Sequence, residues 1–473
     1  MTPSPLTAPE QVAMSMNDFP NRFSPMLVKE LRQGMRTNLF VVAFILLQAV
    51  MILSLMIGLA DPGSSAVGSF FWFFVVTTLL VVQPLRGMNA LSSEIQLNTM
   101  ELIQLTRLDA WRITLGKWTA LNAQTLLFVT GVLPYLVIRY FLGNVNIVMG
   151  LAALLTLSLG SGLASAVTIG CSVFRNFLLR GVILTGFGIG FVSLFAMLEQ
   201  TFFSTGLAGR NLWMLTLVCL SLVYGCFFFL SFGASRIAPL SENLATRKRL
   251  VALGFTLATA GFSFSGLSEP IHVISGLILG FSVIDALTEP LPLYARVLQP
   301  FRRNAMTRVA SFFLAPGWIS GIGFFVFCSL IWGSILFSGG FLASGSWRFE
   351  IEEMTLYLSM CNLLIFPLIF IHLFLGKLAS GNFTFGLYTF VQACLLMVTL
   401  MATVFASAIP RYENLVCLVL PLPSVLIYGA LEGNADDPVF LAIAFTTTIL
   451  AAAVPLARSR QNLREFRHHL NLN

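Results

Sequence analysis

Charged side chains are scarce in this chain of 473 residues, of which only 10% are Asp, Glu, Lys or Arg. Ordinary soluble domains carry about 25%. Hydrophobic residues make up 57%, and 44 Phe contribute to a mean hydropathy of +0.87. So few charges cannot cover the surface of a soluble globule of this length. The composition therefore indicates a protein whose main solvent is lipid.

Motifs for metal or nucleotide chemistry are also missing from the sequence. The pairs Gly116-Lys117 and Gly376-Lys377 lack the earlier glycine and the following Ser or Thr of a phosphate-binding loop. There is no H-E-x-x-H motif and no paired C-x-x-C motif, and the two adjacent histidines lie in a polar tail. We therefore expect no enzyme activity, no cofactor and no metal site in this chain.

The seven cysteines all lie within or beside apolar runs. An odd number placed in this way argues against a disulfide framework and favours small buried side chains. Residues 1–20 are polar and rich in proline, so we expect a disordered tail and no cleavable signal peptide.

Apolar stretches of about 20 residues, the length needed to cross a bilayer, recur along the chain. They predict an all-α polytopic membrane protein with about 12 transmembrane helices. We expect two domains, a six-span half at 21–250 and a second, divergent six-span bundle at 251–473 with a basic tail. The expected spans are 39–60, 68–85, 118–138, 148–174, 178–198, 212–234, 251–267, 272–287, 315–338, 354–376, 383–409 and 439–457.

The apolar piece at 416–430 is short, and Pro421 and Pro423 break a straight helix. If it stays on the outer side, the cytoplasmic segments, including the basic loop at 235–250, hold nearly all of the 27 Lys and Arg. The positive-inside rule therefore favours a re-entrant or interfacial segment, with both termini cytoplasmic in the cell membrane. Because topology already explains the basic residues, we expect no nucleic-acid partner.

An amphipathic helix is predicted just before the first span, over 25–38. Pro25 suits a first helical position, and apolar residues recur at a spacing of four from Leu27. We expect this helix to lie on the cytoplasmic leaflet, with its cations near anionic headgroups. Its charged residues are Lys29, Glu30, Arg32 and Arg36.

A second surface helix is predicted between the second and third spans. Ser93 and Gln96 have the spacing of a capping box. Glu94, Asn98 and Glu101 then fall at i, i+4 and i+7, which places them on one helical face. The physical pattern fits either an acidic helix at the membrane surface or an ordinary solvated loop helix.

This pattern resembles the type-2 family of ABC-type exporter permeases. In that family a cytoplasmic Glu is followed by Gly-Thr-Leu-Glu, a Leu-rich turn ending in Thr, and Gly-Lys at the foot of the third span. The sequence departs at Asn98, where the family usually has Gly, and at Ile95, where Arg is common. The 25–38 helix is similar to the family's Pro-x-x-x-Lys-Glu-Leu-Arg opening. The matching residues of the loop are Glu94, Thr99, Met100, Glu101, Leu102, Leu105, Thr106, Gly116 and Lys117.

The resemblance implies a permease subunit of an exporter, driven by a separate ABC ATPase subunit. It covers 20–250 well and the remainder weakly, and it leaves open a second copy or a homologue as the other permease half. It also implies a re-entrant element before the last span. The implied coupling helix is 92–108, with ATPase-coupling residues Glu94, Asn98, Thr99, Glu101, Leu102 and Thr106.

Ionisable residues inside spans are costly and therefore functional candidates. Arg139 and Glu199 lie at expected outer ends and suit interface anchoring. Asp285 lies near an inner end, where we expect it to pair with Arg296 or another cytoplasmic Arg. His372 suits helix packing better than a proton relay.

Two other classes of function compete with the permease. A twelve-span ion-coupled secondary carrier needs no ATPase, but the sequence indicates neither a buried charge network nor a repeat of its two halves. A membrane-embedded transferase needs a cluster of His, Asp or Glu at one leaflet, which the sequence does not indicate.

Overall fold

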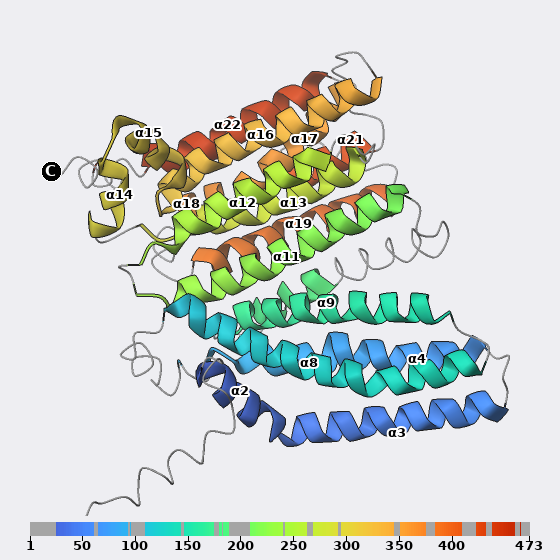
Figure 1. The fold of residues 1–473 in the computed structure, drawn as a ribbon. Helices are drawn as coiled ribbons and strands as arrows, with labels where there is room; N and C mark the ends of the chain where they lie inside the picture. The colour runs from blue at the N-terminus through green and yellow to red at the C-terminus, as the bar shows by residue number, and fades with distance from the viewer. Residues whose placement is uncertain are drawn as a thin grey trace, which may run out of the picture. The chain divides into compact units, whose positions relative to one another are not determined.

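The computed structural model consists of helices and their connections in the part of the chain that it describes (Figure 1). The described residues are 25–60, 65–92, 95, 109–142, 146–174, 179–181, 183–188, 209–239, 242–262, 268–291, 295–344, 351–374, 384–408, 422–431, 438–458 and 464.

Within those residues, 10 helices are long and apolar enough to cross a membrane. They coincide with ten of the twelve expected spans, so the chain is an all-α, multi-pass membrane protein. The expected span at 178–198 is described only in part. The expected span at 251–267 is replaced by a helix of 17 residues, Leu244–Ala260, whose first turns carry Arg247, Lys248 and Arg249. These charges shorten the apolar part of this helix. The expected number of twelve transmembrane helices stays a prediction.

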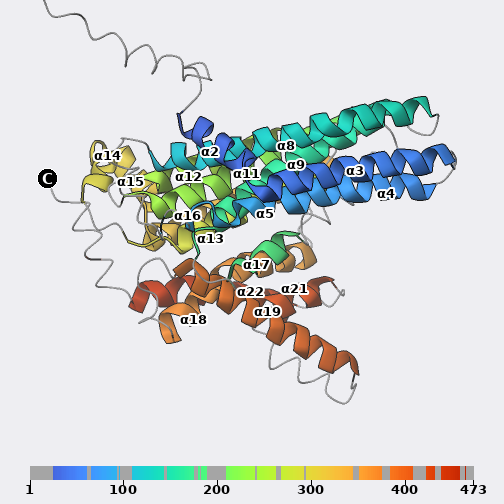
Figure 2. The ribbon, with the colours of Figure 1, turned by 90° about the horizontal axis from the view of Figure 1, so that it is seen from below.

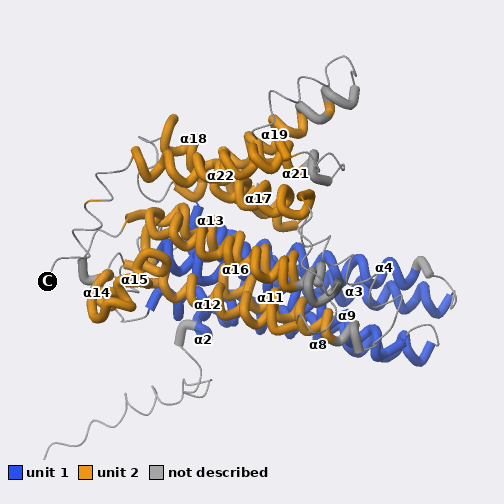
Figure 3. The backbone as a smooth tube through the Cα atoms, turned by 90° about the horizontal axis from the view of Figure 1, so that it is seen from above, with its two compact units in different colours: residues 1–175, 229–237 blue, residues 176–228, 238–473 orange. Residues whose placement is uncertain are grey.

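The chain divides into two compact units, residues 1–175 with 229–237, and residues 176–228 with 238–473 (Figure 3). These two units do not coincide with the two expected domains, whose boundary follows residue 250. The expected division into two sets of six spans stays a prediction.

Unit 1 is a group of long helices that pack side by side, α3 on α4, α3 on α8 and α8 on α9, with α2 against α8. Its elements are α2 Pro25–Met35, α3 Asn38–Ala60, α4 Ser65–Thr77, η1 Thr78–Val82, α5 Gln83–Leu85, η2 Arg86–Asn89, α8 Ala110–Phe141 and α9 Ile147–Cys171, together with the end of α11 Gly209–Ile237.

The span formed by α4, η1, α5 and η2 changes helix type around Pro84. Proline has no backbone N–H, so the regular i to i−4 ladder cannot continue through it. The five residues before Gln83 form a π-helical turn, and the four after Leu85 form a 3-10 turn. Gln83 and Arg86, in this irregular part of the span, donate hydrogen bonds to Leu121 and Gln124 of α8.

Unit 2 contains the start of α11 and the remaining helices. Figure 2 shows α17, α18, α19, α21 and α22 grouped together. The bounds are α12 Leu244–Ala260, α13 Ser268–Leu287, η4 Ala295–Leu298, α14 Gln299–Arg302, α15 Ala305–Leu314, α16 Trp318–Ser344, α17 Ile351–Ile365, α18 Pro367–Phe374, α19 Thr384–Ala408, α21 Pro423–Leu431 and α22 Pro438–Arg458.

The core of unit 2 is formed by apolar side chains of α13, α16, α17, α18, α19 and α22. Pro367 separates α17 from α18 within one expected span, because a proline interrupts the hydrogen-bond ladder. In the segment expected to be re-entrant, the described part is the short helix α21, whose 9 residues cannot cross a bilayer. Whether this segment enters the membrane stays a prediction.

Helix α15 is amphipathic and was not expected from the sequence. Met306, Val309 and Phe312, at i, i+3 and i+6, are all exposed. Arg308 lies on the same short helix, which follows Arg303. An exposed apolar stripe with neighbouring cations is typical of a helix in the headgroup region of a membrane.

Close helix packing in unit 2 depends on a glycine of α16. A Cβ built on Gly321 would lie 2.3 Å from the carbonyl oxygen of Ala286 at the end of α13, whereas one on Gly254 of α12 would meet nothing within 4 Å.

We predict that Gly321→Ala destabilises the protein by about 1–3 kcal/mol through overpacking. Gly254→Ala, the matched control, should leave stability unchanged or raise it by about 0.5–1 kcal/mol. Thermal unfolding of both variants in detergent tests this, and equal melting temperatures would contradict it.

Candidate functional site

Four buried charges meet where α12 and α16 begin and α13 ends, all within unit 2. Lys248 Nζ lies 2.5 Å from Asp285 Oδ2 and 3.0 Å from Glu289 Oε1. Arg249 Nη2 lies 2.9 Å from Glu289 Oε2. The side chains of Lys248, Asp285 and Arg249 are at most 4% exposed, and that of Glu289 is 11% exposed. We call these four residues the ion cluster.

Arg249 also fixes the turn that leads from α15 into α16. Its Nη1 donates to the carbonyl oxygens of Phe313 and Ala315 at 2.9 and 2.6 Å. The backbone N–H of Trp318 donates to the carbonyl oxygen of Glu289 at 3.1 Å. Gly317 in this turn has φ 109°, a region that favours glycine. The guanidinium group thus satisfies carbonyls that have left the helical ladder, which would be costly to bury alone.

Two opposing effects set the pKa values in the ion cluster. Burial alone would lower the pKa of Lys248, but the carboxylates of Asp285 and Glu289 outweigh it and raise that pKa above its ordinary 10.5. Burial alone would raise the pKa of Glu289, but Lys248 and Arg249 hold it below its ordinary 4.5. Both groups therefore stay charged near neutral pH. Asp285 Oδ1 is buried and has no hydrogen-bond partner among the described residues.

The ion cluster bears on two expectations. Asp285 was expected to pair with Arg296, whose side chain lies outside the described part of the structure, or with another arginine; among the described side chains its ion-pair partner is Lys248. A buried charge network was also not expected, because Lys248 and Arg249 belong to a basic stretch that resembles a solvated loop. Only the fold shows that the first turns of α12 are buried. A basic pair immediately before an apolar run was the one indication available in the sequence.

In unit 1, helix α2 packs against α8 and is held there by an ion pair. Lys117 Nζ lies 2.9 Å from Glu30 Oε1, and the two side chains are 6% and 19% exposed. Lys29, Arg32 and Arg36 are exposed, as the prediction of a membrane-surface helix requires. The fold therefore brings together two residues, Glu30 and Lys117, that the family resemblance assigned to separate motifs.

Arg86 is a second attachment of α2 that sequence reasoning missed. Its Nη2 donates to the carbonyl oxygen of Gly34 at 2.7 Å, and its Nη1 donates to Gln124 of α8 and, at 3.1 Å, to Gln83. Gln83 Nε2 donates to the carbonyl oxygen of Leu121 at 3.0 Å. Polar side chains in otherwise apolar spans could have indicated this network.

The proposed coupling residues cannot be compared with these networks. Glu94, Asn98, Thr99, Glu101, Leu102 and Thr106 lie outside the described residues. The structure does place the neighbouring helices, because η2 ends at Asn89 and α8 begins at Ala110.

Two other intramembrane candidates take part in aromatic packing. The ring of His372 lies 4.5 Å from that of Trp318 in unit 2, centroid to centroid. The guanidinium group of Arg139 was expected to reach the interface, but it is buried and lies 4.6 Å from the centre of the Phe71 ring in unit 1. Its cation–π contact explains why it turns inward. Glu199 lies outside the described residues.

In comparisons with known proteins, no family model, no curated protein and no solved structure matches the chain. Its function must therefore be argued from its own residues.

Removing one charge from the ion cluster should be far more harmful than removing a pair. We predict that Lys248→Met costs about 3–5 kcal/mol, because it leaves Asp285 buried without its partner. Lys248→Met combined with Asp285→Leu should recover most of that loss, since Glu289 keeps Arg249. Chemical unfolding in detergent at neutral pH measures both values. A double variant no more stable than Lys248→Met would show that the pair does not act as a unit.

Proposed function

We propose that the chain is the membrane-spanning permease subunit of an ABC-type exporter, energised by a separate ATP-hydrolysing subunit. The observation that carries this proposal is the pair of attachments that join α2 to two successive spans, on the side that the expected topology places in the cytoplasm. Glu30 binds Lys117 of α8, and Gly34 accepts a hydrogen bond from Arg86 of η2. The same two elements flank the acidic stretch at 92–108.

This arrangement supports a mechanical role for the stretch at 92–108. It leads from η2 into α8, and Arg86 of η2 donates a hydrogen bond to Gln124, about four turns after the start of α8. A push on the stretch would therefore move both spans and α2 together rather than one helix alone. In the proposed mechanism, closure of an ATPase dimer pushes on the acidic face with Glu94 and Glu101, and the two spans tilt between inward and outward access. A second copy of the chain, or a homologue, would complete the exporter.

Charge reversal on the acidic face tests the coupling role. In the complex purified from native membranes, Glu94→Lys with Glu101→Lys should abolish stimulated ATP hydrolysis, because like charges would then meet the ATPase groove. Membrane insertion and the yield of the permease should not change. The matched control is Asp436→Lys with Asp437→Lys, a double reversal on the expected outer side, which should retain stimulation. Undiminished stimulation in the Glu94 and Glu101 variant, or purification without any ATPase subunit, would contradict the proposal.

A second candidate function, an ion-coupled secondary carrier, is favoured by one observation. Asp285 is a buried carboxylate in unit 2 with an oxygen that has no hydrogen-bond partner among the described residues. Against it, the two carboxylates of the ion cluster are already matched by Lys248 and Arg249. An added cation would have to displace the Lys248 ammonium group.

A cation titration separates the two candidates. A bound ion at concentration c stabilises the folded state by RT ln(1 + c/Kd), so the melting temperature rises with the ion concentration. If the chain is a permease, replacing choline by Na⁺ at constant ionic strength should leave the melting temperature unchanged. A rise with Na⁺ concentration that is lost in Asp285→Asn but kept in Asp109→Asn, an exposed carboxylate, would instead support the carrier. Thermal unfolding in detergent gives both measurements.

A further inference from the structure

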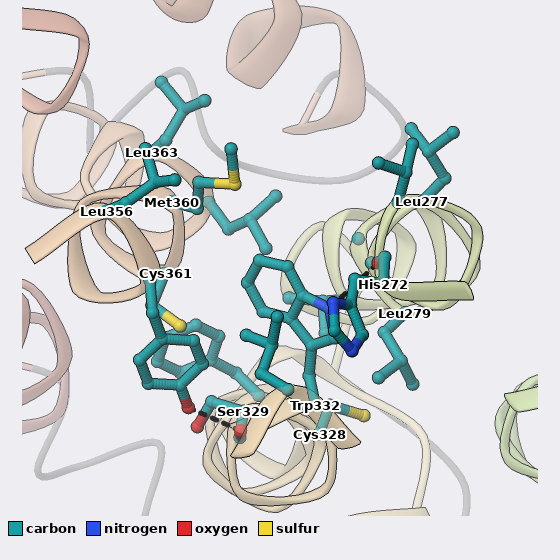
Figure 4. A pocket seen from close by; sticks show the side chains of 18 of the residues that line it. His272, Leu277, Leu279, Cys328, Ser329, Trp332, Leu356, Met360, Cys361 and Leu363 are labelled. Carbon is teal, nitrogen blue, oxygen red and sulfur yellow. Dashed lines mark hydrogen bonds between the residues drawn. The ribbon is translucent and has the colours of Figure 1, made fainter. Parts of the chain in front are cut away.

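A cavity of about 780 Å³ lies inside unit 2, between α13, α16 and α17 (Figure 4). Its volume is within the range of about 300–1,000 Å³ that is usual for small-molecule sites. It extends from His272 to Ile284, about 18 Å of α13, and from Glu353 to Leu364, about 17 Å of α17. The cavity is therefore long enough to hold an extended alkyl chain.

The inner wall offers few free polar groups. The hydroxyl of Tyr357 donates to the backbone carbonyl oxygen of Ser329 at 2.5 Å. The indole N–H of Trp332 donates to the backbone carbonyl oxygen of His272 at 3.1 Å (Figure 4). Each ring therefore presents mainly its apolar surface to the cavity. The thiol-bearing residues Cys328 and Cys361 are also on the lining. A ligand inside would gain mainly from burying apolar surface.

The cavity opens beside exposed apolar side chains. Val273, Leu277 and Phe281 line it at i, i+4 and i+8 of α13, and they are 61%, 50% and 41% exposed. In a membrane-spanning helix, exposed apolar residues of this kind face lipid. A ligand can therefore enter sideways from the hydrocarbon layer rather than from water.

One end of the cavity carries an acidic lining residue. Glu353 in the first turn of α17 lies on the lining, whereas its neighbour Glu352 does not. No ion-pair partner of Glu353 occurs among the described residues. Both carboxylates lie at the end of α17 that the expected topology places at the outer face, so a charged headgroup there would stay near water.

From these observations we propose that this cavity binds a single-chain cationic amphiphile from the membrane. Its alkyl chain lies between α13, α16 and α17, and its ammonium headgroup pairs with the carboxylate of Glu353. Charge complementarity excludes a fatty acid, whose carboxylate would meet Glu353. The site is separate from the proposed ATPase contact, so the inference does not depend on the transport function.

Quenching of Trp332 fluorescence tests the site in nanodiscs that contain the full chain without any ATPase. The probes are 4-bromododecyl-trimethylammonium and its anionic counterpart 4-bromododecanoate, whose bromine lies close to the headgroup and quenches a nearby indole, because Trp332 lies beside His272 and Tyr357 at the Glu353 end of the cavity. We expect saturable quenching by the cationic probe, which disappears in Trp332→Phe, and weak, unsaturated quenching by the anionic probe.

Matched variants test the headgroup contact. Glu353→Gln should weaken binding of the cationic probe about three- to fivefold, the effect of a partly exposed ion pair. Glu352→Gln should leave it unchanged, and both variants should keep the melting temperature of the parent protein. Equal saturable binding of both probes would overturn the choice of a cationic ligand. Quenching that rises linearly with probe content would show ordinary contact with lipid and overturn the site itself.

Discussion

Arg249 satisfies a requirement that a helical membrane protein meets wherever its chain leaves a helix. Carbonyl oxygens outside the helical ladder need donors, and near the hydrocarbon layer water is not always available to supply them. In unit 2 this guanidinium group donates to the carbonyl oxygens of Phe313 and Ala315, while Glu289 balances its charge. The turn into α16 therefore depends on a charge from α12, and the starts of these two helices and the end of α13 are fixed together.

Unit 1 meets the same requirement with Arg86. This residue donates to the carbonyl oxygen of Gly34 and to Gln124, and Lys117 adds an ion pair with Glu30. Each link joins the surface helix α2 to a different span. A force applied between those spans would therefore act on one connected body. The proposed permease function depends on a connection of this kind to a partner that hydrolyses ATP.

Buried charges alone do not distinguish a structural ion-pair network from an ion-coupling site. In the ion cluster, the raised pKa of Lys248 and the lowered pKa of Glu289 keep both groups charged near neutral pH. Two cations and two carboxylates leave little net charge to attract another ion. These properties fit a structural ion-pair network that holds helix ends together. They fit less well a site that must bind and release a cation in each transport cycle.

The sequence by itself determined the class of the protein and the position of ten spans, because long apolar stretches have one stable solution in lipid, the hydrogen-bonded helix. It also indicated α2, whose apolar residues recur with helical spacing. Only the tertiary structure decided that Lys248 pairs with Asp285 and Glu30 with Lys117, and that α13, α16 and α17 enclose a cavity. Partners of these kinds lie 37 and 87 positions apart in the chain. Residue type and local spacing carry no information on which distant helices become neighbours.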